Sequence, residues 1–177
     1  MTAPPLDSTH TDPAHADSAV EPAAALRRIF GEFPSGVVVV AATGPAGPVG
    51  LIASSFTSVS LDPPLVSVNV ARTSTTLPRL RSLESWGVSV LADRQYDVAD
   101  LLRRPAETRF DGLAWRATHD GAIHLDDAAA HFTTRLHSLV PAGDHFIALL
   151  SIDHHATTAD SEPLVFHRSR FRRLQEY

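Results

Sequence analysis

Cysteine is missing from this chain of 177 residues. Its absence excludes disulfide bonds, thiolate zinc sites, cysteine-held iron–sulfur clusters and cysteine nucleophiles. Lysine is missing as well, since all fifteen basic residues are arginine. The chain therefore contains no Schiff-base lysine and no P-loop lysine. Any phosphate group must be held by arginine, by hydroxyl groups or by main-chain N–H groups.

Long apolar runs are also missing, because none approaches the roughly 20 residues that span a bilayer. The first residues show no positively charged region followed by an apolar segment, so we expect no secretory signal and no membrane contact. A cytoplasmic protein is the expectation. The net charge of −5 argues against a general nucleic-acid binder. The hydrophobic content of 44% is that of a globular protein, and the length suffices for one domain with a proper core.

The first twenty residues are rich in Pro, Thr, Ser, Asp, Ala and His and lack apolar periodicity. We expect a disordered or partner-dependent N-terminal arm at residues 1–20 and a single domain at 21–177. A short helix is predicted at 22–30, with Leu26, Ile29 and Phe30 as its buried stripe.

A series of short strands follows. The continuous Val and Ala run at 36–43 predicts a strand buried on both faces. Further strands are expected at 49–58, 65–70, 86–91, 113–118, 132–139, 145–154, 163–166 and 170–174, the last two ending the sheet. Two more helices are expected near 74–83 and 96–104, and a loop at 105–112. Many strands and few helices predict a mainly β fold with a closed antiparallel barrel.

The densest group of hydroxyl side chains lies in the seven residues from Ser54 to Ser60, just before Asp62-Pro63-Pro64. A polar sheet face is one interpretation, because Ser and Thr commonly cover strand surfaces. The other is a ligand site, since small residues such as Ala53, Ser54 and Ser55 let a planar ring approach the main chain. Composition alone favours the polar face.

A second motif, Arg72-Thr73-Ser74-Thr75-Thr76-Leu77-Pro78, precedes a predicted helix. Its hydroxyls can cap the free N–H groups of the helix. The same geometry can bind a phosphate, with Arg72 adding positive charge. The two interpretations are compatible, and in a chain without lysine this motif is the best candidate anion site.

Three further motifs have structural interpretations that suffice on their own. Phe33-Pro34-Ser35-Gly36-Val37 is a turn between helix and strand. Arg109 can pair with Glu107 or Asp111 on its loop as readily as with a phosphate. Gly143-Asp144-His145 forms a tight turn that opens a strand. The ten histidines follow no metal-ligand spacing, so no metal site is expected.

These motifs occur together in one order, which resembles the flavin reductase-like family, a branch of the FMN-binding split-barrel superfamily. This family supplies the small reductases of two-component flavin-dependent monooxygenases. The matching segments are Phe33 to Val37, Ala53 to Val68, Arg72 to Thr75, Arg109-Phe110, Gly143-Asp144-His145 and Pro163 to His167. One departure is Phe171, where many relatives carry tyrosine, so a hydroxyl role there does not carry over.

The resemblance implies a closed antiparallel split β-barrel and a homodimer with flavin near the subunit interface. The positions it places around the flavin are Ser35, Gly36, Val37, Ala53, Ser54, Ser55, Ser60 and Leu61. It places Arg72, Ser74 and Thr75 on the phosphate side, with Arg109 and Phe110 nearby. Gly143 and Asp144 belong to the same site, and His145 is the catalytic candidate beside the nicotinamide.

The implied reaction is hydride transfer from nicotinamide C4 to flavin N5, with the protein orienting the rings. FAD or FMN is the flavin, and NADH, or alternatively NADPH, is the donor. The reduced flavin then diffuses to a separate monooxygenase. Two alternatives stay open: a split-barrel flavoprotein that keeps its flavin as an oxidase or binding module, and a non-catalytic β-barrel interaction domain.

Overall fold

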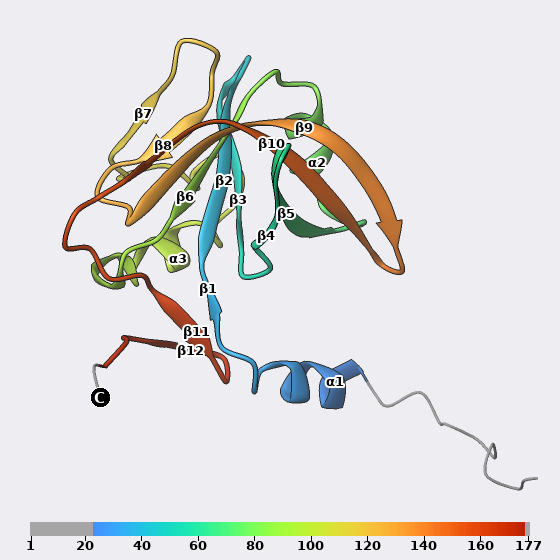
Figure 1. Ribbon diagram of the computed structural model, residues 1–177, viewed down its shortest axis with the longest axis vertical. Helices are drawn as coiled ribbons and strands as arrows, with labels where there is room; N and C mark the ends of the chain where they lie inside the picture. The colour runs from blue at the N-terminus through green and yellow to red at the C-terminus, as the bar shows by residue number, and fades with distance from the viewer. Residues whose placement is uncertain (1–22, 176–177) are drawn as a thin grey trace, which may run out of the picture.

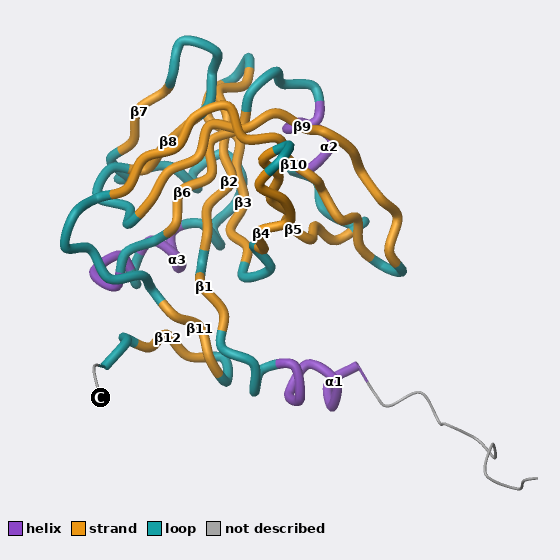
Figure 2. The backbone as a smooth tube through the Cα atoms, viewed as in Figure 1, coloured by secondary structure: helices purple, strands orange, loops and turns teal. Residues whose placement is uncertain are grey.

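The computed structural model describes residues 23–175, so the N-terminal arm expected at 1–20 lies outside the described part. Most described elements are strands (Figure 2). Seven of them form the main antiparallel sheet, in the order β3-β2-β6-β9-β10-β5-β4. Their bounds are Val38–Gly44 (β2), Gly47–Ala53 (β3), Thr57–Leu61 (β4), Pro64–Ala71 (β5), Trp86–Val90 (β6), Ala130–Ala142 (β9) and His145–Thr157 (β10).

Two smaller sheets accompany the main one. The first contains β1 (Ser35–Gly36), β11 (Val165–His167) and β12 (Arg170–Arg172), and the second pairs β7 (Trp115–Ala117) with β8 (Ile123–Leu125). The helices are α1 (Ala23–Phe30), α2 (Leu77–Arg81) and α3 (Val98–Leu101), with a 3₁₀ turn at Asp93–Gln95. Figure 1 shows α1, β11 and β12 together at one end of the molecule, below the curled main sheet. None of the helices between residues 23 and 175 is long and apolar enough to cross a membrane.

The core lies on both faces of β2, as the apolar run at 36–43 predicts. Val38 and Val40 face one cluster, which contains the fully buried Trp86. Val37 and Val39 face the other, under α3 and the β7–β8 pair. Because successive strand residues point to opposite faces, a strand between two apolar clusters has to be apolar throughout.

The main sheet is strongly curled. β3 and β4 stand at its two opposite edges, yet only residues 54–56 connect them. The hydroxyl of Ser55 accepts the N–H of Asn69 at 2.9 Å and donates to its carbonyl at 3.3 Å, which ties this connection to β5. The sheet therefore bends until its edges approach each other, although no ladder joins β3 to β4 or β5 in the described part of the chain.

Several sequence predictions are confirmed and others are wrong. The long pair expected from 132–139 and 145–154 is β9 and β10, joined by a two-residue turn. The strand expected at 49–58 is two strands, because the chain crosses there from one sheet edge to the other. The strands near 165 and 171 do not end the main sheet: β11 pairs with β1, and β12 pairs with β11, in a separate sheet. The helix expected at 96–104 covers only Val98–Leu101.

The predicted buried stripe of α1 is also wrong. Ile29 is 57% exposed and Phe30 68% exposed, whereas Leu26 is half-buried. The reason is the position of the helix: α1 contacts the β11–β12 turn, where the N–H of Arg168 donates to the carbonyl of Gly31. Nothing in the described chain covers the opposite side of the helix at these two residues.

Candidate functional site

A large hollow in the described part of the chain has a volume of about 700 Å³. It lies where the end of β3, the second half of β5 and the start of β10 come together, and Phe30 of α1 borders it. Ala53, Ser54 and Ser55 form one wall, and His145 stands in another. Two of the predicted motifs, the hydroxyl-rich segment and Gly143-Asp144-His145, therefore meet at one place.

The outer edge of β3 supplies main-chain groups to this hollow. β3 is an edge strand, so one row of its N–H and C=O groups has no ladder partner. The carbonyl of Gly50 lies on that outer row, because it accepts a 2.7 Å hydrogen bond from Arg109 rather than from β2. Since strand backbone groups alternate sides, the N–H and C=O of Ile52 point the same way, toward the hollow that Ile52 lines.

His145 is held by its neighbour Asp144. Nδ1 of His145 lies 2.7 Å from a carboxylate oxygen of Asp144, and the imidazole side chain is 45% exposed. The hydrogen bond from His145, together with its charge, holds the pKa of Asp144 below its usual range. An ionised carboxylate only accepts hydrogen bonds, so Nδ1 carries the proton and Nε2 of neutral His145 is an acceptor.

The turn that carries this pair is itself anchored. Gly143 has a φ of 60° at the first of the two turn residues, the position where a type II′ hairpin turn needs glycine. The N–H of Arg72 donates to the carbonyl of Asp144 at 2.9 Å, and its guanidinium donates to that of Gly143 at 3.2 Å. Arg72 also lies over the ring of Phe146, 5.2 Å from its centre. Arg72 thus fixes the turn and keeps further N–H donors for a ligand.

Ser74 confirms the capping interpretation of its motif. Its hydroxyl accepts the N–H groups of Thr76 and Leu77 at 3.3 and 3.2 Å, just before α2. Ser74 also borders the large hollow and a neighbouring one of about 370 Å³, which Arg72 and Arg81 line. The motif and the helix that follows it therefore place Arg72 and Arg81 at this neighbouring hollow. The side chain of Thr75 is exposed and borders neither hollow.

The residues from Ser35 to Val37 lie at the junction of the two sheets. Ser35 and Gly36 form β1 and pair with β11, and Val37 is buried. Val37 borders a small hollow of about 130 Å³ with Phe166 and Phe171. Ile52, Ala53 and Ser54 line both this hollow and the large one. The predicted residues Ser35 to Val37 are therefore near the large hollow, on the other side of the end of β3.

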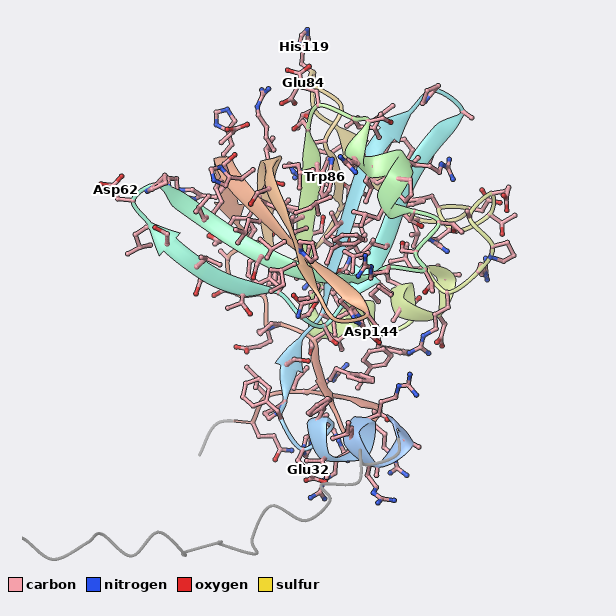
Figure 3. The ribbon with its side chains drawn as sticks, turned by 90° about the vertical axis from the view of Figure 1, so that its right-hand side faces the viewer. Glu32, Asp62, Glu84, Trp86, His119 and Asp144 are labelled. Carbon is pink, nitrogen blue, oxygen red and sulfur yellow. The ribbon has the colours of Figure 1, made fainter. Side chains whose placement is uncertain are left out.

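Besides Thr75, four predicted residues stand away from the large hollow in the single chain. Ser60 and Leu61 lie at the end of β4, where Leu61 is 96% exposed. Figure 3 shows the neighbouring Asp62 at the far edge of the molecule, well apart from Asp144. Arg109 is bound to the carbonyl of Gly50 and to the hydroxyl of Thr76, and Phe110 is buried in the core. Their contact with a ligand stays a prediction, and for Arg109 and Phe110 the structure shows an anchoring role.

Several residues that line the hollow were missed by sequence analysis, and three of them are instructive. Phe30 had been placed on a buried stripe, Ile52 looked like an ordinary strand residue, and Asn69 carried no motif signal. Only the alternation of residues 65–70 could have singled out Asn69, as a polar side chain between buried valines. Ile52 contributes through its main chain, which no side-chain pattern reveals.

The hollow suits a planar heteroaromatic ring such as that of a flavin. Its volume lies within the range of about 300–1,000 Å³ that is typical of small-molecule sites. Small side chains at Ala53, Ser54 and Ser55 permit close approach to the main chain, and Ile147 adds an apolar surface. Arginine at position 72 lies beside it for a phosphate. The residues present therefore fit a flavin nucleotide.

Comparison with known proteins agrees with this geometry. The family profile described as "Flavin reductase like domain" matches residues 30–175. A probable flavin reductase of Rhizobium meliloti (strain 1021) is 43% identical over 126 residues, 71% of this chain and 40% of that protein. The stachydrine N-demethylase reductase subunit Stc3 of the same organism is 43% identical over 122 residues, 68% of this chain and 53% of that protein. The chain thus spans about half or less of these two relatives.

Other relatives match over most of their length. The NADH:FMN oxidoreductase of Rhodococcus erythropolis is 32% identical over 178 residues, covering 94% of this chain and 93% of that protein. Among solved structures, Streptomyces globisporus C-1027 NADH:FAD oxidoreductase SgcE6 in complex with NAD and FAD fragments has a TM-score of 0.79 and 38% identity, covering 85% of this chain and 91% of that one. The profile covers the whole curled sheet and the hollow within it, and the chain belongs to the flavin reductase-like family.

Proposed function

We propose that this chain is an NAD(P)H:flavin oxidoreductase that reduces FMN or FAD and supplies the reduced flavin, by diffusion, to a separate monooxygenase. The observation that carries the proposal is the meeting of the β3 edge and the Asp144–His145 pair at one hollow of about 700 Å³. Relatives named NADH:FMN oxidoreductase and NADH:FAD oxidoreductase support both the donor and the two flavins. A relative named as a reductase subunit supports the separate oxygenase.

The residues act by binding and orientation. When bound, the flavin supplies the chemistry by accepting hydride from the nicotinamide. The outward N–H and C=O groups of Ile52 and Ser54 can bind the polar edge of the ring, and Arg72 can bind the phosphate. Nε2 of His145 can accept a hydrogen bond from the nicotinamide carboxamide, and Asp144 keeps the imidazole in that tautomer. No side chain has to form a covalent bond.

The first experiment measures NADH oxidation by the purified protein in air with FMN, with FAD and without added flavin. Turnover that saturates with added flavin is the expected result, and it ranks the two flavins. Flavin that co-purifies and stays bound, with poor NADH oxidation, would favour the tightly bound flavoprotein instead. No flavin binding and no oxidation with NADH or NADPH would overturn the proposal.

We also propose a homodimer. Ile29, Phe30 and Phe33 form an exposed apolar surface at α1, and Phe33 is 79% exposed. Val59 and Leu61 form another on β4. Burying such side chains between copies removes apolar area from water. Ser60 and Leu61 contact flavin only if a second copy brings them to its hollow, so their assignment rests on the dimer. Light scattering of the wild type should give twice the chain mass, and Phe33→Ser should shift it toward the monomer.

The proposal also includes the closure of the sheet and the extent of the domain. The curled sheet closes into a split barrel, which the short connection at residues 54–56 and the Ser55–Asn69 hydrogen bonds support. The domain includes the described residues 23–175, and the arm expected at 1–20 lies outside them. We place the protein in the cytoplasm, where NADH and the oxygenase are available. A chain without cysteine forms no disulfide bonds and so needs no oxidising compartment to fold.

A further inference from the structure

A second hollow, of about 580 Å³, lies between α1 and the turn that joins β11 to β12. Arg27 and Arg28 reach it from the last turn of α1, and Arg168 and Ser169 reach it from the β11–β12 turn. We call it the basic hollow. The two segments are far apart in the chain, so the sequence shows two separate arginine groups rather than one cluster.

The basic hollow is built around one fixed arginine. Nε of Arg168 donates to the carboxylate of Glu32 at 2.8 Å, and the N–H of Arg168 donates to the carbonyl of Gly31 at 2.9 Å. Arg168 and Ser169 have φ values of 50° and 59°, which side-chain-bearing residues rarely adopt. Primed hairpin turns favour Asn and Gly at these positions. In this turn the two positions are occupied by Arg168 and Ser169, and both residues border the basic hollow.

The charges in the basic hollow do not cancel. Three arginines and one glutamate line it, which leaves a net charge of +2 on a chain whose net charge is −5. Glu32 is engaged by Arg168. Within residues 23–175, no carboxylate lies within ion-pair distance of Arg27 or Arg28. Figure 3 shows nitrogen-tipped side chains gathered around α1 near Glu32. Exposed guanidinium groups in a concave surface are suited to phosphate oxygens.

Helix α1 borders both the basic hollow and the hollow of about 700 Å³. Phe30 lines the larger hollow, and Arg27, one helical turn earlier, lines the basic one. Arg27 is also close enough to Asp144 that its charge adds a small contribution to the lowered pKa of that carboxyl, after the dominant hydrogen bond from His145. On the side of α2, which Figure 1 shows at the other end of the molecule from α1, Ser74 borders the larger hollow and Arg72 borders the neighbouring hollow of about 370 Å³.

The proposed reaction brings two phosphorylated nucleotides together, and the structure offers two arginine-lined places for their phosphates. We infer that the basic hollow binds a phosphate group of the nicotinamide dinucleotide, while the flavin phosphate lies near Arg72. Arg27 and Arg28 supply the free guanidinium groups, and Arg168 and Ser169 form the opposite wall. With the phosphate held at α1, the nicotinamide can reach His145 across Phe30. This inference rests on the proposed function.

The test uses the full-length double variant Arg27→Gln/Arg28→Gln, which leaves the Arg168–Glu32 pair intact. ADP-ribose, the dinucleotide without its nicotinamide, is titrated into flavin-saturated protein, and KM values for NADH and NADPH are measured with excess flavin. We expect the Kd of ADP-ribose and both KM values to rise about tenfold, the scale of one or two lost charge-assisted hydrogen bonds. The Kd of FMN should stay that of the wild type. A larger loss for NADPH assigns the hollow to its 2′-phosphate, and equal losses assign it to the diphosphate.

The matched control is Arg94→Gln, which removes the same charge type from a surface where Arg94 pairs with Asp127. It should leave all these constants unchanged. Unchanged ADP-ribose binding and KM values in the Arg27/Arg28 variant would overturn the inference. A weakened affinity for FMN but not for riboflavin would overturn it too, because the hollow would then hold the flavin phosphate. Failure of the wild type to oxidise either NADH or NADPH would instead refute the proposed function.

Discussion

The carboxylate of Asp144 lies 2.7 Å from Nδ1 of His145, at the turn where β9 leads into β10. The same turn receives two hydrogen bonds from Arg72. The imidazole is therefore fixed at the rim of the large hollow in one tautomer, with Nε2 as the acceptor. An exposed histidine at a strand start is usually unremarkable, and it is this set of fixed contacts that distinguishes His145.

Asp144→Asn should lower kcat/KM for NADH about tenfold, because an amide can donate to Nδ1 and so favour the opposite tautomer. Steady-state kinetics with excess FMN measures the effect. Asp97→Asn, an exposed carboxylate that forms no cap hydrogen bond, is the matched control. A wild-type kcat/KM in Asp144→Asn would show that the pair has no role in the reaction.

His145→Ala should reduce the rate of flavin reduction at low NADH by about 10- to 100-fold, because it removes the group that orients the nicotinamide. Flavin binding should change little, since the ring is held chiefly by the β3 edge. Stopped-flow absorbance of the flavin measures the reduction rate, and fluorescence quenching measures the flavin Kd. Wild-type reduction at low NADH would remove His145 from the mechanism.

Much of the fold follows from local patterns, whereas the site depends on contacts between distant segments. The run at 36–43 and the pair β9–β10 were predictable because alternation and burial are written in neighbouring residues. The position of β3 and β4 at opposite sheet edges was not, because pairing partners lie far along the chain. For the same reason the prediction of one strand at 49–58 was wrong. The hydroxyl-rich segment contains residues 54–56, where the chain passes from β3 at one edge of the sheet to β4 at the other.

Arg109 illustrates the limit for single residues. Its loop offers Glu107 and Asp111 as obvious ion-pair partners, and the resemblance offers a phosphate. In the structure it binds the carbonyls of Gly50 and Arg104 and the hydroxyl of Thr76, and its contact with a phosphate stays a prediction. A main-chain carbonyl leaves no mark in a sequence, so neither prediction could find these contacts. The basic hollow was missed for a related reason, since its arginines come from both ends of the domain.

Arg109→Gln should lower the free energy of unfolding by about 1–3 kcal/mol, because it leaves the Gly50 carbonyl without its charged donor. Urea unfolding measures the loss. If the role is anchoring, the Kd values of FMN and riboflavin change by the same factor. A selective loss of FMN affinity, with stability intact, would show instead that Arg109 holds the flavin phosphate. Arg104→Gln, an exposed neighbour, serves as the control.

Gly50→Ala should also destabilise the protein, by about 1–3 kcal/mol. An added Cβ would stand 2.6 Å from the ring of Phe110 and 2.9 Å from the carbonyl of Val40, and neither can move freely in the core. Thermal unfolding of Gly50→Ala beside Gly36→Ala makes the comparison, because no atom lies within 4 Å of a Cβ built at Gly36. Equal melting temperatures for the two variants would contradict the close packing of Phe110 on β3.

His124 should make the protein less stable in mild acid. Burial lowers its pKa from 6.5, and the neighbouring His131, with ring centres 5.1 Å apart, lowers it further. The Phe132 carbonyl, at 3.3 Å from Nε2, and Asp120 act in the opposite direction, while Arg116 adds to the lowering. Because the folded pKa lies below the unfolded one, this stabilisation is complete above pH 6.5 and is lost as the pH falls through the folded pKa.

Urea unfolding at pH 7.5 and pH 5.5 measures this loss. His124→Gln keeps an N–H donor for the Phe132 carbonyl but cannot titrate, so it should lose less stability than the wild type between the two values. His137→Gln, at an exposed position on β9, should behave as the wild type does. If His124→Gln and the wild type lose the same free energy of unfolding between pH 7.5 and pH 5.5, other groups cause the acid sensitivity. Protonation of His124 would then make no measurable contribution to it.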